Sequence, residues 1–303
     1  MTWNPFFSVV IPTYNRSGLL IHTIDAILKQ SFNDYEIIIV DDGSTDNTVE
    51  VIQPILKNEK RILLLNQENK ERGAARNHGL LKAKGTYVVF FDSDDLMHDN
   101  HLNVLHQNIL EQNFPFFIAT KFDFINEKEK HFPSDICKLS QGYYNYNLFL
   151  NGNPLACNIC VKKANPDLFL FEEDRRFSIK EDWMFMLQNF QQNKLFIIDQ
   201  ITISMLDHSD RSMRSDNKEI IKRTLSACEW ILLKINLNTK ELNKLKAHVY
   251  YFCGIHSYLD NNIEAVFNFV IKAIKFGGFK MKYISLLLKS IVGRKILSKL
   301  NEK

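Results

Sequence analysis

Three carboxylates follow an apolar run in the stretch VVFFDSDDLM, where Asp92, Asp94 and Asp95 come directly after residues 88–91. Close carboxylates repel one another, and at the end of a buried strand each tends to take up a proton unless a cation balances its charge. Mg²⁺ takes one or two protein carboxylates and completes its shell with water and substrate phosphate. The spacing D-x-D therefore predicts a site for Mn²⁺ or Mg²⁺ and a diphosphate. The alternative for so short a motif is that Asp94 and Asp95 are solvated and cap a helix expected near Asp99.

The elements that must position these carboxylates alternate between strand and helix. Short apolar runs predict strands, and apolar residues spaced three and four apart predict helices. The first strand is expected to stop at Pro12. The expected strands cover residues 7–11, 36–40, 61–67 and 87–92, and the expected helices cover residues 17–30, 48–56 and 74–83. This order indicates an α/β fold with a doubly wound sheet and right-handed connections.

Polar clusters follow three of these strands: PTYN at residues 12–15, DDGS at residues 41–44 and DSDD at residues 92–95. In doubly wound sheets, ligands bind at the carboxyl ends of the strands. We therefore expect the three clusters to converge on one site.

The pattern is looser after about residue 115. The expected elements are a strand at 116–126, a helix and a strand within 138–163, a helix from Glu181 and a pair of strands within 194–206. From about residue 215 the chain is helical in pattern, basic and free of proline. We place a boundary near residue 212, which gives a domain of residues 1–212 and a helical region of residues 213–303.

Composition and charge exclude several classes of protein. The chain has 303 residues, of which 45% are hydrophobic and 24% charged, so disorder is excluded and one or two folded domains are expected. A formal net charge of +3 is too small to indicate nucleic-acid binding. We see no signal-peptide pattern and no apolar stretch of the ~20 residues that a spanning helix needs, so we expect a cytoplasmic protein.

The five cysteines are odd in number and scattered, as expected of reduced thiols. Cys157 and Cys160 form a C-x-x-C, but no second pair and no histidine pair follows at zinc spacing. We interpret them as small residues of a buried segment, with a metal or redox site as the alternative.

Five motifs, in this order and at these separations, resemble those of the family 2 glycosyltransferases: SVVIPTYNR, EIIIVDDGSTDNT, ENKERGAARNHGL, GTYVVFFDSDD and KEDWMFM. The resemblance covers roughly residues 6–212. It implies the nucleotide-diphospho-sugar transferase fold called GT-A, with a doubly wound mixed sheet, here followed by a helical extension. It also implies an inverting enzyme that uses a nucleotide-sugar donor, with a UDP-sugar expected, and Mn²⁺ or Mg²⁺ as cofactor.

The resemblance assigns the first two motifs to the nucleotide. Pro12, Thr13, Tyr14 and Asn15 match the segment that lines the nucleotide pocket, where Tyr14 would lie against the base. Asp42 matches the acidic residue that accepts a hydrogen bond from uracil, and a carboxylate can indeed accept from an imide N–H. The alternative for Asp42 and the aspartate before it is a role in the turn or in a helix cap.

The same resemblance places five further residues beside the donor. Arg76 matches a residue near the base and phosphates, with a solvated charge on a helix face as the alternative. Asp92 is expected near the ribose with Ser93 beside it, and Asp94 at the metal, with Asp92 and Asp95 as further candidate ligands. The bound ion would act as a Lewis acid that neutralises the leaving diphosphate.

Asp182, in KEDW, matches the catalytic base of the family, and Glu181 accompanies it as in many members. The acceptor hydroxyl would attack the anomeric carbon from the face opposite the diphosphate, and a carboxylate there takes the proton. A single displacement of this kind inverts the configuration. Two acids at a helix start also fit the ordinary preference for negative charge at that place, which is the alternative interpretation.

Residues 207–215, DHSDRSMRS, loosely resemble the family's segment after the last strand. His208 and, less clearly, Arg211 would approach the diphosphate or the metal there, although hard cations prefer oxygen ligands. A loop with solvated charges is the alternative.

Residues 265–300 contain no acid but eight basic residues, interleaved with apolar ones. A helix with basic and apolar faces suits the surface of an anionic membrane, which attracts each positive charge by roughly 1 kcal/mol. The alternatives are a terminal helix whose lysines face water and an interface between the subunits of a homo-oligomer.

These observations together predict an inverting glycosyltransferase with a glycan or lipid-linked glycan acceptor, on the cytoplasmic face of a membrane and without nucleic-acid binding. The alternative is a non-catalytic subunit that binds nucleotide sugars in a glycan assembly complex, but such a subunit would lose the base. A sugar-1-phosphate nucleotidyltransferase would need a Gly-rich, Arg-containing loop after the first strand, and PTYNRSG is not such a loop.

Overall fold

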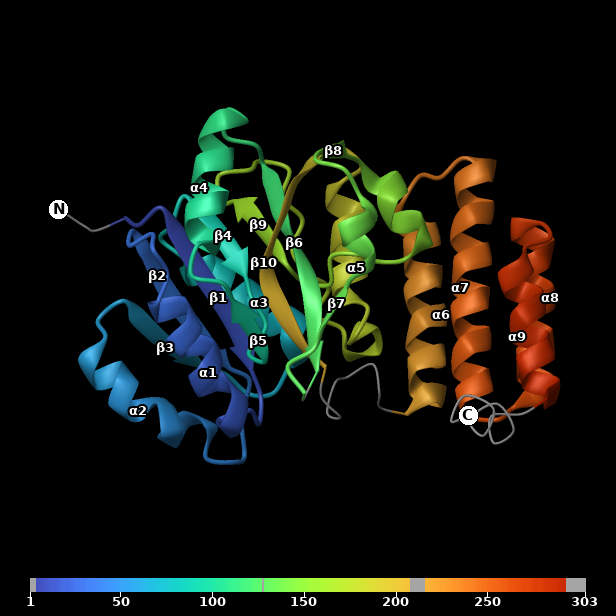
Figure 1. Cartoon of the computed structure of the whole chain (residues 1–303), viewed down its shortest axis with the longest axis horizontal. Coiled ribbons are helices and arrows are strands. Elements are labelled where there is room, and N and C mark those ends of the chain that lie inside the picture. The colour runs from blue at the N-terminus through green and yellow to red at the C-terminus, as the bar shows by residue number, and fades with distance from the viewer. Residues whose placement is uncertain (1–3, 127, 208–215, 293–303) are drawn as a thin grey trace. The chain divides into compact units, whose positions relative to one another are not determined.

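The computed structural model describes residues 4–126, 128–207 and 216–292 (Figure 1). The chain divides into two compact units. The first comprises Met1–Tyr146, Pro154–Ser178 and Asn189–His208, and the second comprises Asn147–Asn153, Ile179–Gln188 and Ser209–Lys303. The boundary expected near residue 212 lies outside the described residues.

A mixed sheet forms the centre of the first unit, and its strand order is β3-β2-β1-β4-β9-β6-β10-β5. In chain order these strands are β1 (Phe7–Thr13), β2 (Tyr35–Asp41), β3 (Ile62–Asn66), β4 (Tyr87–Phe90), β5 (Asp95–Met97), β6 (Phe117–Asn126), β9 (Ile159–Lys162) and β10 (Leu195–Asp207). Strand β1 is parallel to both β2 and β4, and β2 is parallel to β3. Strand β9 is antiparallel to both of its neighbours. The doubly wound mixed α/β sheet is therefore confirmed.

Helices connect these strands as the sequence predicts. They are α1 (Ser17–Leu28), α2 (Thr48–Asn58), α3 (Glu71–Lys82) and α4 (His101–Glu111). Helix α1 buries the apolar stripe of Leu20, Ile24 and Ile27. Helix α3 lies close against β1 and β2, because a Cβ built on Gly79 would stand 2.4 Å from Cγ1 of Val10.

The expectation that the first strand stops at Pro12 is wrong, because β1 continues to Thr13. The carbonyl of Val10 accepts from the N–H of Phe91, on the β4 side, and the carbonyl of Thr13 accepts from residue 42, on the β2 side. Pro12, two residues after Val10, therefore faces the β4 side beyond Phe90, where β4 has already ended. The missing N–H of Pro12 costs no ladder hydrogen bond there.

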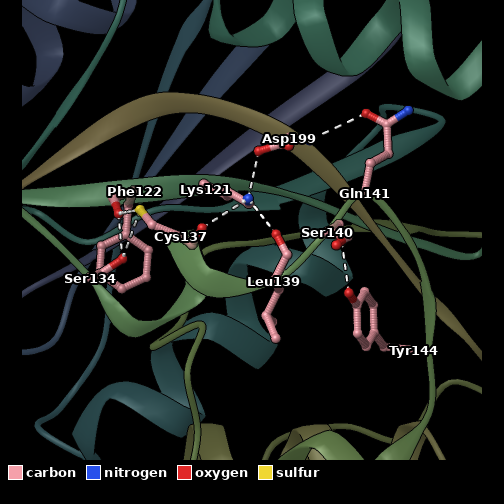
Figure 2. Close-up of polar contacts among 9 residues, drawn as sticks. All are labelled: Lys121, Phe122, Ser134, Cys137, Leu139, Ser140, Gln141, Tyr144 and Asp199. Carbon is pink, nitrogen blue, oxygen red and sulfur yellow. Dashed lines mark hydrogen bonds and ion pairs between the residues drawn. The ribbon is translucent and has the colours of Figure 1, made fainter.

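The expected pair of strands within 194–206 is one continuous strand, β10, so that prediction is also wrong. Its register against β6 shifts between Ile197 and Ile203, around the polar residues Asp199 and Gln200. The buried ammonium of Lys121 on β6 donates to the carbonyls of Cys137 and Leu139 and pairs with Asp199 of β10 at 2.5 Å (Figure 2). The polar residues of β10 thus lie in a bulge, which allows Asp199 to pair with the buried ammonium of Lys121.

Several short elements carry no clear signal in the sequence. Strand β7 (His131–Pro133) pairs with β6, and β8 (Gly142–Tyr144) pairs with β10. Of the helix and strand expected within 138–163, the strand is β9, whereas the helix is only the 3₁₀ segment η2 (Tyr146–Asn151). Two further 3₁₀ turns are η1 (Asp135–Lys138) and η3 (Arg175–Phe177).

Helices make up the described part of the second unit apart from η2 and the adjoining loops. They are the start of α5 (Glu181–Asn189), then α6 (Asn217–Lys234), α7 (Thr239–Leu259), α8 (Ile263–Gly277) and α9 (Met281–Val292). Helices α8 and α9 meet in a core of Val266, Val270, Ala273, Tyr283 and Leu286. The predicted helical extension is confirmed. None of the helices within the described ranges is both long and apolar enough to cross a bilayer.

Candidate active site

Parallel pairing brings the polar strand ends of the first unit to one edge of the sheet. Thr13 at the end of β1 lies opposite Asp41 at the end of β2. The N–H of Asp42 donates to the carbonyl of Thr13 at 2.9 Å, which extends this pairing by one residue. Strand β4 runs in the same direction beside β1, so the three clusters PTYN, DDGS and DSDD end at the same edge.

The segment after β1 presents one aromatic ring and anchors one loop. The side chain of Tyr14 is 45% exposed at this edge, whereas Pro12 and Thr13 are buried. Asn15 has a positive φ of 51°, and its Oδ1 accepts from the N–H of Thr45 at 2.8 Å. Asn15 therefore ties the end of β1 to the loop before α2, while Tyr14 is placed to offer a flat face to a ligand.

The three aspartates near the end of β2 have different partners. Asp41 accepts from the N–H of Ser44, which is a turn contact, and Asp46 accepts from the N–H of Thr48 at the start of α2. The turn and the helix cap are therefore supplied by Asp41 and Asp46. Asp42 is 3% exposed and has neither of these contacts, so it serves neither the turn after β2 nor the start of α2; its Oδ1 instead accepts from the N–H of Lys70, just before α3.

Arg76 is among the most buried side chains of the described chain, at 1% exposure. Its Nη2 pairs with Oδ1 of Asp92 at 2.7 Å, and its guanidinium lies 5.4 Å from the ring centre of Phe171. A solvated charge on a helix face is therefore the wrong interpretation of Arg76. Arg76 thus places a permanent positive charge from α3 beside Asp92, the first carboxylate of the D-x-D motif.

The rest of the D-x-D cluster is divided between the surface and the sheet. Asp94 is partly exposed, and its Oδ2 lies 3.8 Å from Nη2 of Arg16. Asp95 and Ser93 are buried, and Asp95 begins β5, opposite Met205 of β10. Helix α4 starts only at residue 101 with residue 100 as its N-cap. The alternative that Asp94 and Asp95 are solvated caps of this helix is therefore wrong.

The donor set at this edge fits a divalent ion only if that ion takes few protein ligands. Within the described ranges, no group of three or more His, Cys, Asp or Glu side chains is arranged to hold a metal. Asp92 and Asp94 offer carboxylate oxygens at the edge, and one or two such ligands are what Mg²⁺ accepts when a diphosphate and water complete its shell.

Cys157 and Cys160 are buried, and burial raises the pKa of the Cys160 thiol, as expected of small buried residues.

The second unit holds the candidate base at the start of α5. Oδ2 of Asp182 accepts from the side-chain amide of Asn153 at 2.9 Å, and Oδ1 accepts from the N–H of Trp183 at 2.7 Å. The Trp183 indole donates to the carbonyl of Phe149 in η2 at 2.7 Å, which fixes this turn of α5. Glu181 is buried at 2% exposure, so Asp182 is the more accessible of the two acids.

A buried lysine precedes these acids. Lys180 is 9% exposed, and its ammonium lies 4.1 Å from the ring centre of Phe252 on α7. Burial lowers the pKa of Lys180, and the negative charges of Asp182 and Glu181 oppose this effect. The neighbouring His248 is partly buried, and its desolvation together with Lys180 and a second lysine lowers its pKa to about 4, so the imidazole is neutral at pH 7.

Two of the expected site residues and several unexpected ones complete the description. His208 and Arg211 lie outside the described residues. Sequence reasoning missed Asn153 and Gln67, which donates to Asp42 and is described further below, and it gave no role to Lys180 of the KEDW motif. Asn153 and Gln67 stand out only through contacts in space, and the burial of Lys180 cannot be read from a motif.

Comparison with known proteins places this geometry in a family. The model of the family described as "Glycosyl transferase family 2" matches residues 8–171. An uncharacterized glycosyltransferase of Rickettsia felis is 36% identical over 167 residues, which are 55% of this chain and 27% of that protein. Glycosyltransferase GlyG of Streptococcus pneumoniae serotype 4 is 39% identical over 118 residues, 39% of each chain. The chain thus spans well under half of the length of these curated relatives.

Among solved structures, residues 1–349 of S. aureus TarS in complex with UDP-GlcNAc share the fold, with a TM-score of 0.69 and 18% identity. The match covers 98% of this chain and 91% of the TarS chain. On the strength of the family match over more than half of its length, this chain belongs to glycosyl transferase family 2.

Proposed function

We propose that this protein is an inverting glycosyltransferase that moves a sugar from a UDP-sugar to a hydroxyl of a glycan or lipid-linked glycan. One observation carries the proposal: Tyr14, Asp42, the Arg76–Asp92 pair and Asp94 end at one edge of the sheet. An aromatic face, an acceptor carboxylate, a fixed guanidinium and a metal-ligating carboxylate are the groups that a nucleotide diphosphate requires. The binding of UDP-GlcNAc by TarS, which has the same fold, supports a UDP-sugar donor.

The carboxylates of the D-x-D cluster have separate roles in this proposal. Asp94, which is partly exposed, would ligate Mn²⁺ or Mg²⁺, and Asp92, held by Arg76, would face the ribose or share the ion. When bound, the ion supplies Lewis-acid stabilisation of the departing diphosphate. Arg76 stays protonated at any working pH and limits repulsion between Asp92 and the donor phosphates.

Asp182 would act as the general base toward the acceptor hydroxyl. Its two oxygens accept from the neutral donors Asn153 and Trp183, which orient the carboxylate and leave it able to take a proton. Glu181 is buried and would not touch the acceptor. A binding subunit without catalysis would not need this arrangement, so turnover is what separates the two functions.

The test is a panel of nucleotide sugars assayed for Mn²⁺-dependent binding and hydrolysis. Asp182→Asn should keep donor binding and lose turnover by ~10²- to 10⁴-fold, the usual range for a lost general base. Asp94→Asn should weaken binding only when the metal is present. Asp25→Asn, at an exposed position of α1, is the matched control and should change nothing. Donor binding without turnover in the unmodified protein would favour the non-catalytic subunit.

We further propose that the protein contacts an anionic membrane through α9. Tyr283 and Leu286 of α9 pack into the core of the unit, whereas Met281, Leu288 and Ile291 are 79%, 59% and 63% exposed. The apolar side chains therefore form an outward stripe opposite the packed face. Such a stripe on a helix suits insertion at a lipid headgroup boundary.

Lysines flank this stripe. Lys280, Lys282 and Lys289 are exposed, and the acid-free stretch from residue 265 to residue 300 places no carboxylate among them. Arg294, Lys295 and Lys299 of the same stretch lie outside the described residues. Positive charge beside an apolar stripe is complementary to an anionic lipid surface rather than to a second, equally basic copy of the chain.

Co-sedimentation with vesicles of phosphatidylserine and phosphatidylcholine tests the membrane contact. Binding should require the anionic lipid and should fall at least tenfold when Leu288 and Ile291 are both changed to Asn. Leu233→Asn on α6, 85% exposed in the same unit, is the matched control and should bind normally. A dimer in solution that dissociates in the double variant would overturn the proposal in favour of a subunit interface.

A further inference from the structure

The carboxylate of Asp42 receives both of its described hydrogen bonds on one oxygen. The side-chain amide of Gln67 donates to Oδ1 at 2.7 Å, and the N–H of Lys70 donates to the same atom at 2.9 Å. No described residue donates to Oδ2. Asp42 is 3% exposed and lies at the edge where the strand ends meet, so Oδ2 is an acceptor in a largely enclosed position that a ligand can complete.

The orientation of Gln67 follows from chemistry. A carboxylate can only accept, so the NH₂ group of Gln67 must face Asp42, and its carbonyl oxygen must face His78. Oε1 of Gln67 lies 2.9 Å from Nδ1 of His78, and because an amide oxygen can only accept, Nδ1 carries the proton. His78 thus fixes Gln67, and Gln67 fixes Asp42.

The backbone around this chain of contacts leaves it little freedom. The N–H of Gln67 donates to the carbonyl of Asp41 at 3.0 Å, which extends the pairing of β2 and β3 beyond Asn66. Gly43 has a φ of 77°, and a Cβ there would stand 3.0 Å from the N of Asn69. The loop that follows β3 is therefore packed directly against the turn that follows β2.

We propose that Gln67, held by His78, is a positioning residue for nucleobase choice: it commits Oδ1 of Asp42 to the protein and leaves Oδ2 for the N3–H of uracil. This inference rests on the proposed function. Cytosine carries a lone pair at N3 instead of a hydrogen, so a fixed carboxylate oxygen would repel it. A carboxylate that can turn discriminates less, because it can move away from the wrong base.

Isothermal titration of UDP and CDP, each with Mn²⁺, tests the inference. The unmodified protein should bind UDP more tightly than CDP. Gln67→Leu keeps the size of the side chain but removes the amide, and it should lower the UDP-to-CDP affinity ratio by ~3- to 10-fold, the range for one lost hydrogen bond. His78→Phe should act in the same direction with a smaller effect, because Gln67 then keeps its bond to Asp42.

Gln53→Leu, at an exposed position of α2, is the matched control and should leave the ratio unchanged. The ratio is a readout that a general loss of stability would not move, because both nucleotides share every group except the base. If the unmodified protein binds neither nucleotide, the proposed function fails. If it binds UDP but both Gln67→Leu and His78→Phe leave the ratio unchanged, only the positioning role fails. If Gln67→Leu does not fold, the ratio in His78→Phe decides.

Discussion

The two sets of acids in this protein are held by different kinds of neighbour. In the first unit, Asp92 pairs with the buried guanidinium of Arg76 at 2.7 Å, and this cation keeps its charge at every accessible pH. In the second unit, Asp182 accepts from the neutral donors Asn153 and Trp183, and Lys180 is a nearby cation whose pKa burial lowers. A residue that binds a cation needs a constant charge, whereas a residue that accepts a proton during the reaction needs surroundings that tolerate both of its states.

This contrast predicts that Arg76→Met is the most damaging single change of the three considered below. It removes a charge that is buried at 1% exposure and the ion pair that this charge makes with Asp92. We expect a loss of about 2 to 4 kcal/mol in the free energy of unfolding, measured with urea.

The matched control for Arg76 is Arg176→Met. Arg176 pairs with Asp174 at 2.7 Å but is 73% exposed, so its removal should lower the free energy of unfolding much less than the removal of Arg76. Equal losses of unfolding free energy in Arg76→Met and Arg176→Met would show that burial does not make the Arg76–Asp92 pair stronger than an exposed ion pair. The contrast between the two sets of acids would then lack support.

Each unit contains a histidine whose pKa is strongly lowered by burial, and this predicts loss of stability in acid. Burial and the positive charges of Lys180 and Lys282 lower the pKa of His248 in the second unit to about 4, from 6.5 in the unfolded chain. Between pH 6.5 and about pH 4, His248 binds a proton in the unfolded chain but not in the folded chain. The contribution to stability is therefore complete above pH 6.5 and is lost as the pH falls through 4, by on the order of 2 to 3 kcal/mol.

Tryptophan fluorescence can follow this effect in the second unit, because Trp183 and Trp230 both belong to it. In a Trp3→Phe background, His248→Phe should flatten the dependence of unfolding on pH between 7 and 4. His101 in the first unit, whose pKa burial lowers to about 3, should not affect that signal when it is changed to Phe. An unchanged slope in His248→Phe would mean that other groups set the acid limit of this unit.

The smallest expected change in stability comes from Lys180, and it tests most directly whether the cation near Asp182 differs from the cation beside Asp92. Burial lowers the pKa of Lys180, so its charge destabilises the fold at neutral pH, and this cost disappears as the pH rises through the folded pKa towards the unfolded value of 10.5. Lys180→Met should therefore stabilise the protein at pH 7, by about 1 kcal/mol. Thermal unfolding at pH 7 measures this, and destabilisation would mean that the ammonium is satisfied where it lies.

Much of the fold could be predicted from the sequence, because local periodicity determines most of it. The alternation of strands and helices through residue 92 and the helical end of the chain were both readable. The two strand predictions that were wrong depend on strands that lie far away in the sequence. Pro12 is tolerated in β1 because β4 ends before it, and β10 is one strand because its polar residue Asp199 pairs with Lys121 of β6. Neither contact can be read from the residues that surround Pro12 or Asp199 in the sequence.

The candidate site was predictable to the extent that it consists of motifs. The aspartates and Arg76 were found by spacing and resemblance, and the structure adds their burial and partners. Gln67 and Asn153 were missed because only their contacts in space distinguish them, and Lys180 of the KEDW motif was given no role because its burial is not visible in the sequence. Gln67 lies 25 positions from Asp42, and Asn153 lies 29 positions from Asp182.

The direct approach of α3 to the sheet at Gly79 also bears on how new donor preferences can be engineered. With no side chain between this helix and Val10, α3 cannot roll or shift without separating the strands beneath it. Arg76, almost one turn earlier on that helix, shares its immobility. Random libraries that alter the proposed donor site should therefore spare α3 and Gln67, and should vary only the exposed side chains of Glu68 and Lys70 in the connection between β3 and α3.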